Sequence, residues 1–173
     1  MMMKMLSAGG LEVLTDQIRV ADEDNPKGYY EYERVKKLKD GDHIWVEGAQ
    51  GKVVKVISAL LEYLPPQFQY KVIFMRRNMH EILASQKEML IRRGEPTDKV
   101  SDEQIAELYA KHLSKIEAWL SKQQNMKVLY VSYNDFLAEP EKHGEKIIQF
   151  LDQPLQVEQM AQVVDKNLYR QRI

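Results

Sequence analysis

The sequence predicts an α/β fold, a three-layer sandwich in which helices cover both faces of a mostly parallel sheet. Short apolar runs of strand character alternate along the chain with segments of helical periodicity. Strands separated by helices in this order form parallel sheets with helices on both faces. The length of 173 residues, with 44% hydrophobic residues, suits one domain with a single core.

The first half of the chain is expected to hold short elements separated by polar loops and turns. These elements are a helix in the opening MMMKML, a strand at Leu11–Leu14, a helix at Tyr29–Leu38, a strand at Lys52–Ile57 and a helix at Ala59–Leu64. The helix at Tyr29–Leu38 is predicted because Tyr30, Arg34 and Leu38 share one face. The helix at Ala59–Leu64 must end where two prolines follow.

The second half predicts longer helices with clear start signals. The elements are a strand at Tyr70–Met75, a helix from Asn78 to about Arg92, a helix from Ser101 to about Gln123, a strand at Lys127–Tyr133, and helices at Glu141–Leu151 and Val157–Val164. Asn78 is a good N-cap, and Glu81 can complete a capping box with it. Ser101 caps the longest helix, whose buried side is expected to include Leu108.

Composition excludes several classes of function. A formal charge of −1 provides no basic field for nucleic acid, so we expect no nucleic-acid partner. The chain has no cysteine, which fits a reducing compartment and leads us to expect a cytoplasmic protein. No apolar run approaches the roughly 18 residues of a spanning helix, so we expect no membrane association. The four histidines lack the spacing of metal ligands, and we expect no metal.

The most informative segment is Tyr70–Gln86, YKVIFMRRNMHEILASQ, in which a strand ends in two arginines and a helix starts at once. The strand delivers Arg76 and Arg77 to the carboxyl edge of the sheet, where open α/β folds bind their ligands. A helix amino terminus beside a guanidinium favours phosphate or sulfate, because N–H groups, the helix dipole and the arginine fork all attract an anion. This segment therefore predicts an anionic ligand.

The stretch VIFMRRNMHEILASQ resembles the 3′-phosphate-binding strand and helix of the P-loop sulfotransferases that use PAPS, 3′-phosphoadenosine 5′-phosphosulfate. In that family an arginine ends the strand and a serine follows eight positions later. The resemblance implies that Arg77 and Ser85 bind the 3′-phosphate, with Arg76 as a neighbour. It also implies transfer of a sulfuryl group from PAPS to a hydroxyl or amine of an unknown acceptor, with adenosine 3′,5′-bisphosphate as product.

A second stretch, Val128–Leu155, is similar to the family's next strand, its Tyr-Glu-Asp-Leu turn and the helix end that follows. Here Asn134 replaces the usual glutamate and Asp152 the usual glycine. The pieces DEDNPKGYYEYE, GKVVKVISALLEYLP and DKNLYRQR resemble a bacterial sulfotransferase-like subgroup. Together these stretches extend the resemblance over nearly the whole chain.

One departure from the family concerns the start of the fold. The family opens with a strand and a Gly-x-x-Arg-Ser-Gly-Thr-Ser type loop around the 5′-phosphosulfate, and these 173 residues contain no such loop. The opening MMMKML resembles the helix that follows the loop, so the first strand and loop are expected to be missing. Without the loop the sulfuryl group would lose electrostatic stabilisation, and we expect this polypeptide to be inactive or nearly so. Exposed strand edges also make a homodimer an expectation. The alternative function is a non-catalytic member of the fold that binds a nucleotide or a protein.

Three further residues are candidates, each with a plainer alternative. Lys55 interrupts an apolar strand, and either directs its ammonium at the sulfonate or lies near an exposed strand end. Glu23, or its neighbour Asp24, is a candidate general base for the acceptor, although a solvated turn has the same composition. Arg170 is a candidate phosphate ligand, and a frayed tail is the alternative.

Overall fold

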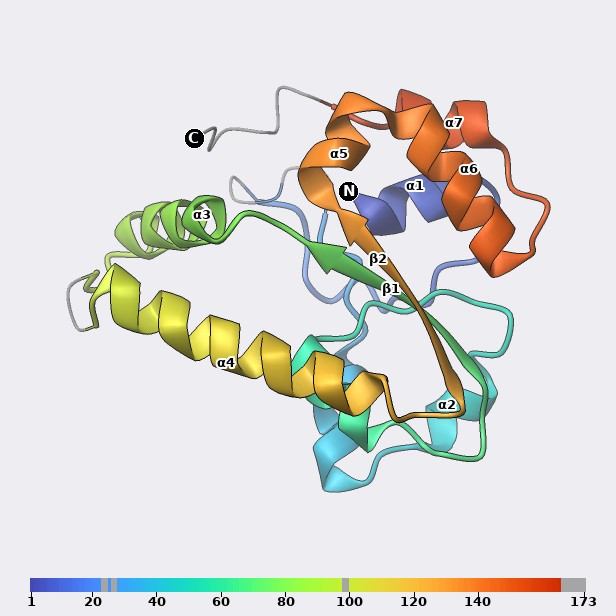
Figure 1. The fold of residues 1–173 in the computed structure, drawn as a ribbon, viewed down its shortest axis with the longest axis horizontal. Coiled ribbons are helices and arrows are strands. Elements are labelled where there is room, and N and C mark those ends of the chain that lie inside the picture. The colour runs from blue at the N-terminus through green and yellow to red at the C-terminus, as the bar shows by residue number, and fades with distance from the viewer. Residues whose placement is uncertain (23–24, 26–27, 98–99, 166–173) are drawn as a thin grey trace.

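Two parallel strands form the sheet at the centre of the fold (Figure 1). The computed structural model describes residues 1–22, 25, 28–97 and 100–165. Strand β1 (Tyr70–Arg76) pairs with β2 (Met126–Ser132) in register, with Tyr70 opposite Met126 and Arg76 opposite Ser132. Because the strands are parallel, both carboxyl ends lie at one edge, where the two arginines of the sequence analysis are found.

Side chains of both strands alternate between two apolar clusters, as the period of two in a strand requires. The cluster on one face includes Ile73, Met75, Leu129 and Val131. It packs against α1 (Met2–Ala8), α6 (Pro140–Leu151) and α7 (Val157–Gln162). The cluster on the opposite face includes Val72, Phe74, Met126 and Val128, and packs against α4 (Asp102–Leu120) and η2 (Ser58–Tyr63). Helices on both faces of a parallel sheet confirm the predicted α/β class.

A third apolar cluster is formed by residues from the first half of the chain. It is built from Val35 and Leu38 of the 3₁₀ helix η1 (Glu33–Asp40) and from Trp45 and Val46 of α2 (Ile44–Glu47). The indole of Trp45 donates a hydrogen bond to the carbonyl oxygen of Asp42 at 2.9 Å, so the buried N–H is satisfied. This cluster closes the end of the molecule away from the carboxyl edge of the sheet (Figure 1).

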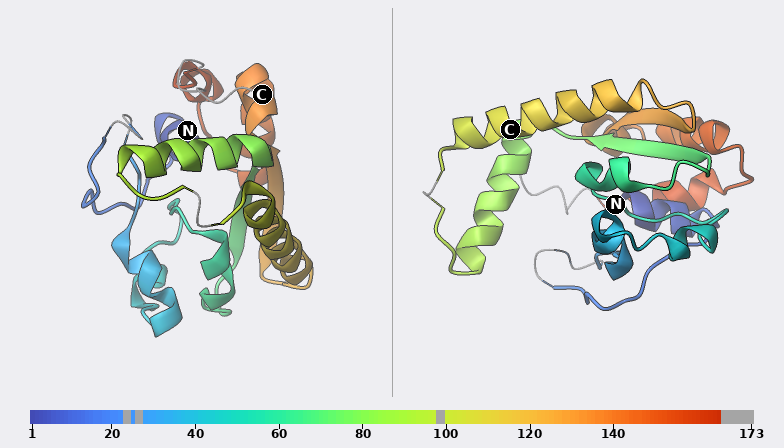
Figure 2. Two further views of the ribbon diagram at one scale, coloured as in Figure 1. Left: turned by 90° about the vertical axis from the view of Figure 1, so that its left-hand side faces the viewer. Right: turned by 90° about the horizontal axis from the view of Figure 1, so that it is seen from below.

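The helices α3 (Met79–Arg92) and α4 begin at the predicted caps, but the predicted capping box of Asn78 with Glu81 is wrong, because the Glu81 carboxylate accepts from Arg77 and Asn134 instead. The side chain of Asn78 accepts from the backbone of His80, and Ser101 forms a complete capping box with Gln104. Figure 2 shows α3 and the first half of α4 extending beyond the sheet. Leu108 is therefore 63% exposed, and its prediction as a buried residue is wrong, because this part of α4 lies beyond the core.

The predicted strands at Leu11–Leu14 and Lys52–Ile57 are wrong as strands. In the described part of the chain they form a single parallel bridge between Val13 and Val53. Val53 packs against the cluster of α1 and Val54 with the cluster of Trp45, so the side chains alternate as they do in a strand. A strand also needs a continuous hydrogen-bonded neighbour, and here the pairing ends after two backbone bonds, from Leu14 N–H to the carbonyl oxygen of Val53 and from Val53 N–H to that of Glu12. The lack of a longer partner therefore overrides the strong strand propensity of this run.

The predicted helix at Tyr29–Leu38 is correct only in its second half, where η1 begins at Glu33. Tyr30 has a positive φ of 52°, a left-handed conformation that no α-helix can include. Two helices were not predicted, α2 and α5 (Tyr133–Ala138), and α5 directly follows β2 with Ser132 as its cap. Among the described residues, no helix has the length and apolar character needed to cross a membrane.

Candidate functional site

The candidate site lies at the carboxyl end of β1, where the chain turns from strand to helix. Arg76 ends the strand, Arg77 and Asn78 form the turn, and Met79 begins α3. The Asn78 side chain accepts a hydrogen bond from the His80 N–H at 2.9 Å. This cap satisfies one N–H group of the first helical turn and fixes the direction in which the helix leaves the sheet.

Arg77 is held in a defined orientation. Its Nε donates to Oε2 of Glu81 at 2.9 Å, and its guanidinium lies 4.8 Å from the ring centroid of Tyr133. A charge-assisted hydrogen bond and contact with an aromatic face restrict the guanidinium more than either would alone. The side chain is 25% exposed, so a ligand can reach it from solvent while Glu81 and Tyr133 hold it in place.

Glu81 is the buried charged residue of the described core, with 1% of its surface exposed. Its second oxygen, Oε1, accepts from the side-chain amide of Asn134 at 2.8 Å. A buried carboxylate is tolerated when both oxygens have donors. Burial also raises the pKa of the nearby Tyr133 phenol, and the Arg77 charge acts in the opposite direction.

Sequence reasoning missed this pairing, because it considered Glu81 only as a capping residue and Asn134 only as a departure from the family. The spacing of Arg77 and Glu81, four residues apart, was the available signal, since an acid and a base at that distance readily meet at a helix start. The hydrogen bond from Asn134 to Glu81 had no local signal in the sequence, because the two residues are 53 positions apart.

Arg76 lies apart from this network and faces α4. Its guanidinium pairs with Glu117 of α4 at 2.6 Å, and it lies 4.2 Å from the ring centroid of Tyr130. Adjacent arginines therefore point to different neighbours, as alternation at a strand end requires. Arg76 and Arg77 provide a natural comparison, because the partner of Arg76 is 32% exposed and the partner of Arg77 is buried.

Ser85 lies in the second turn of α3, four residues beyond Glu81. This spacing places it on the same side of the helix as Glu81 and hence on the side that faces Arg77. The serine is exposed, and among the described residues its hydroxyl has no hydrogen-bond partner. Its assignment as a phosphate ligand stays a prediction.

Lys55 does not lie in a buried strand, so the burial predicted for it from the sequence is wrong. Its side chain is 41% exposed, and its ammonium contacts Oε1 of Glu31 at 3.1 Å and the carbonyl oxygen of Tyr29 at 3.2 Å. Burial would raise the pKa of Glu31, but Lys55 together with Arg19 and Lys36 holds that pKa below its usual value. The role of Lys55 toward a sulfonate stays a prediction, and Glu23 and Arg170 lie outside the described residues.

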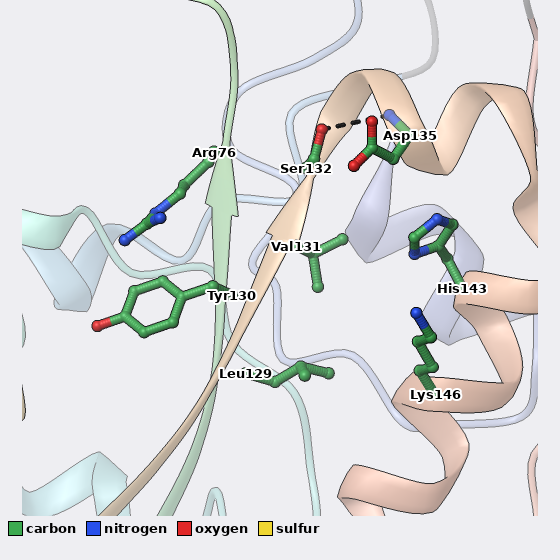
Figure 3. Close-up of a pocket in the computed structure, with 8 residues that line it drawn as sticks. All are labelled: Arg76, Leu129, Tyr130, Val131, Ser132, Asp135, His143 and Lys146. Carbon is green, nitrogen blue, oxygen red and sulfur yellow. Dashed lines mark hydrogen bonds between the residues drawn. The ribbon is translucent and has the colours of Figure 1, made fainter.

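A cavity of about 400 Å³ opens beside β2 (Figure 3). It is lined by Arg76, Leu129, Tyr130, Val131, Ser132, Asp135, His143 and Lys146. Its lining includes neither Arg77 nor Glu81, so the cavity adjoins the candidate site without forming it. Within the part of the chain that the structure describes, no group of three or more His, Cys, Asp or Glu side chains could hold a metal ion.

Comparison with known proteins identifies the family. A family model described as the sulfotransferase family matches residues 16–157, which is most of the chain. The chain belongs to the sulfotransferase family. No curated protein and no solved structure matched the chain in the corresponding comparisons.

This membership confirms the predicted relation to the sulfotransferase family, and implies a nucleotide sulfuryl donor and an acceptor. The matched region contains Glu23, Lys55, Arg77 and Ser85. Arg170 lies outside it. The Arg77 network is thus part of the sulfotransferase domain itself.

Proposed function

We propose that this sulfotransferase domain binds PAPS, with Arg77 and Ser85 holding the 3′-phosphate of the nucleotide. The observation that supports this most strongly is the anchoring of Arg77 by Glu81 and Tyr133 at the carboxyl edge of the sheet. A ligand at this position would meet an oriented guanidinium and the first turn of α3 together. Both attract phosphate, the first by charge-assisted hydrogen bonds and the second by its dipole.

The residues present fit a phosphate group. Arg77 donates from Nε to Glu81, and its planar guanidinium presents N–H donors in a fork that matches the oxygens of a phosphate. Ser85 offers a hydroxyl on the same side of α3, and within the described part of the chain this hydroxyl has no hydrogen-bond partner. When bound, PAPS would supply the sulfuryl group for transfer to a hydroxyl or amine, and adenosine 3′,5′-bisphosphate would be released.

The finer roles belong to the same proposal. Lys55 would stabilise charge at the sulfonate, and for this its ammonium would exchange its contact with Glu31 for one with the ligand. Glu23 would act as the general base that takes the proton of the acceptor. Arg170 would add a second positive charge near the nucleotide.

This polypeptide by itself is proposed to bind the nucleotide without efficient transfer. Its 173 residues include no Gly-x-x-Arg-Ser-Gly-Thr-Ser type loop to surround the sulfuryl group. The hydrogen-bond donors of such a loop would supply most of the electrostatic stabilisation in a transfer of this kind. In the described residues β1 pairs only with β2, so its other edge can accept a second chain, which supports the proposal of a homodimer.

The absence of that loop motif also favours a second candidate, a non-catalytic member of the family that binds a nucleotide or a protein. The two candidates differ in whether labelled sulfur from PAPS appears in an acceptor. A panel of phenols, alcohols and amines incubated with radiolabelled PAPS would separate them.

Calorimetric titration with adenosine 3′,5′-bisphosphate tests the binding site. We expect the protein to bind this nucleotide and Arg77→Ala to weaken binding at least tenfold, because a charge-assisted hydrogen bond contributes about 1.5–3 kcal/mol. Arg76→Ala is the matched control, since it removes an adjacent arginine that pairs with surface Glu117, and it should change affinity less than about twofold.

Two outcomes would contradict the assignment. Unchanged binding by Arg77→Ala would remove Arg77 from the phosphate site. No binding by a sample that circular dichroism shows to be folded would favour the protein-binding alternative.

A further inference from the structure

We propose that Glu81 is a positioning residue for nucleotide binding, which fixes the Arg77 guanidinium so that it meets the 3′-phosphate in a single orientation, and that Asn134 holds Glu81 in place. The inference rests on the proposed function, because it assigns a role in the same phosphate site. Neither Glu81 nor Asn134 was a candidate from the sequence.

The burial of Glu81 is the first argument. A carboxylate with 1% of its surface exposed is costly to place in a protein interior, whereas Arg77 beside it remains 25% exposed. The buried partner is therefore the fixed one, and the exposed partner is oriented by it. The position of Glu81 in the first turn of α3 adds the favourable helix dipole.

The use of both carboxylate oxygens is the second argument. Oε2 accepts from Arg77 Nε at 2.9 Å, and Oε1 accepts from Asn134 Nδ2 at 2.8 Å. A carboxylate held at both oxygens cannot rotate to offer Arg77 a different geometry. The Tyr133 ring, 4.8 Å from the guanidinium, restricts the remaining tilt. Together these contacts prepare Arg77 before a ligand arrives, which reduces the entropy lost on binding.

Two other roles for Glu81 predict different behaviour. As a structural link between α3 and α5 only, it would affect stability and all ligands equally. As a bare negative charge near a phosphate, it would oppose binding, and its removal would strengthen affinity. A positioning role predicts the opposite sign, namely that neutralising Glu81 weakens binding of a ligand with a 3′-phosphate.

The experiment compares adenosine 3′,5′-bisphosphate with adenosine 5′-monophosphate, which lacks the 3′-phosphate, by calorimetry on the full chain. We expect Glu81→Gln to weaken binding of the bisphosphate about tenfold and to change binding of the monophosphate less than twofold. In the Arg77→Ala background, Glu81→Gln should have no further effect, because it acts through Arg77. Glu88→Gln, which removes an exposed carboxylate of the same helix, is the control and should bind as the wild type does.

Asn134→Ala is the second variant, in case Glu81→Gln does not fold. It keeps the carboxylate and removes one of its donors, and we expect a two- to fivefold selective loss for the bisphosphate. Circular dichroism and thermal melting of each variant confirm that the sample is folded.

The outcomes are distinct. A wild type that binds both nucleotides equally overturns the proposed function and this inference with it. A wild type that prefers the bisphosphate, combined with unchanged or stronger binding by Glu81→Gln, overturns the inference alone. Equal loss for both nucleotides, or a further loss in the Arg77→Ala background, assigns Glu81 a structural role and also overturns it.

Discussion

The side-chain amide of Asn134 donates to the buried carboxylate of Glu81 across 2.8 Å, and so joins α5 to α3. The family resemblance places a glutamate at position 134, which would set two acids against each other at this contact. Asparagine provides a neutral donor instead. In this chain the asparagine that replaces the family's glutamate thus supplies a hydrogen-bond donor to the buried Glu81 of α3.

Asn134→Asp should therefore destabilise the protein by about 2 kcal/mol at pH 7, because it replaces a donor with a second carboxylate beside a buried one. Urea denaturation measures the change. Gln124→Glu introduces the same charge at an exposed position and should alter stability by less than about 0.5 kcal/mol. Equal effects of the two substitutions would show that the buried contact has no special sensitivity.

Gly9→Ala should destabilise the protein by about 1–3 kcal/mol, because the new Cβ would lie 2.7 Å from Cγ of Met160, which is fully buried. Gly48→Ala is the matched control. Both glycines end a helix with nearly the same backbone angles, φ −71° and −73°, yet a Cβ at Gly48 would approach nothing closer than 3.7 Å. Stability of Gly48→Ala should stay unchanged or rise by up to about 1 kcal/mol. Thermal melting compares them, and a similar loss in both would contradict the packing argument.

Asp16 should make the stability depend on pH in acid. The Glu33 N–H, 2.6 Å from Oδ2 of Asp16, lowers the pKa of this carboxyl below its usual 3.8. A group with a lowered pKa stabilises the fold above the unfolded value, and that contribution is lost as the pH falls through the lowered pKa. The stability difference between wild type and Asp16→Asn should be constant above about pH 5 and shrink below about pH 4.

Urea denaturation at a series of pH values between 2.5 and 7, roughly the range in which such carboxyls titrate, measures this dependence. Asp40→Asn, which removes an exposed carboxyl at the end of η1, is measured alongside as the control for the loss of one negative charge. A constant difference for Asp16→Asn at every pH would refute the prediction.

Elements with local signals could be predicted from the sequence. The strand β1 has a continuous apolar run, and α3 and α4 begin at Asn78 and Ser101, whose side chains cap the helix a few residues away. A cap depends only on neighbours in the chain. The two-sided covering of the sheet follows from the order of strands and helices, which is also visible in the sequence.

The run Lys52–Ile57 could not be judged in the same way, because a strand depends on a partner elsewhere in the chain. Its composition is that of a strand, but in the described residues Val53 bridges only Val13. The helix predicted from Tyr29 failed for a backbone reason, the positive φ of Tyr30, for which tyrosine gives no sequence signal.

The candidate site also has a part with local sequence signals and a part that depends on distant residues. Arg77 stands at a strand end beside a helix cap, so its place was predictable from the local pattern and the family resemblance. The carboxylate of Glu81, which supports Arg77, is itself held by Asn134, 53 positions later in the chain. Sequence periodicity gives no information on a contact over that separation. The burial predicted for Lys55 depended on a strand at Lys52–Ile57, and 41% of its side chain is exposed because that strand does not form.

The parallel pairing of β1 with β2 also governs when the protein can acquire its structure. A hairpin closes as soon as its turn is made, but Tyr70 must wait for Met126, 56 positions later in the chain. At roughly 5–20 residues per second, a ribosome needs about 3–11 s to synthesise that interval. During this interval the apolar side chains of β1 lack the neighbouring strand that β2 will provide, so the sheet forms late, after most of the chain has been synthesised.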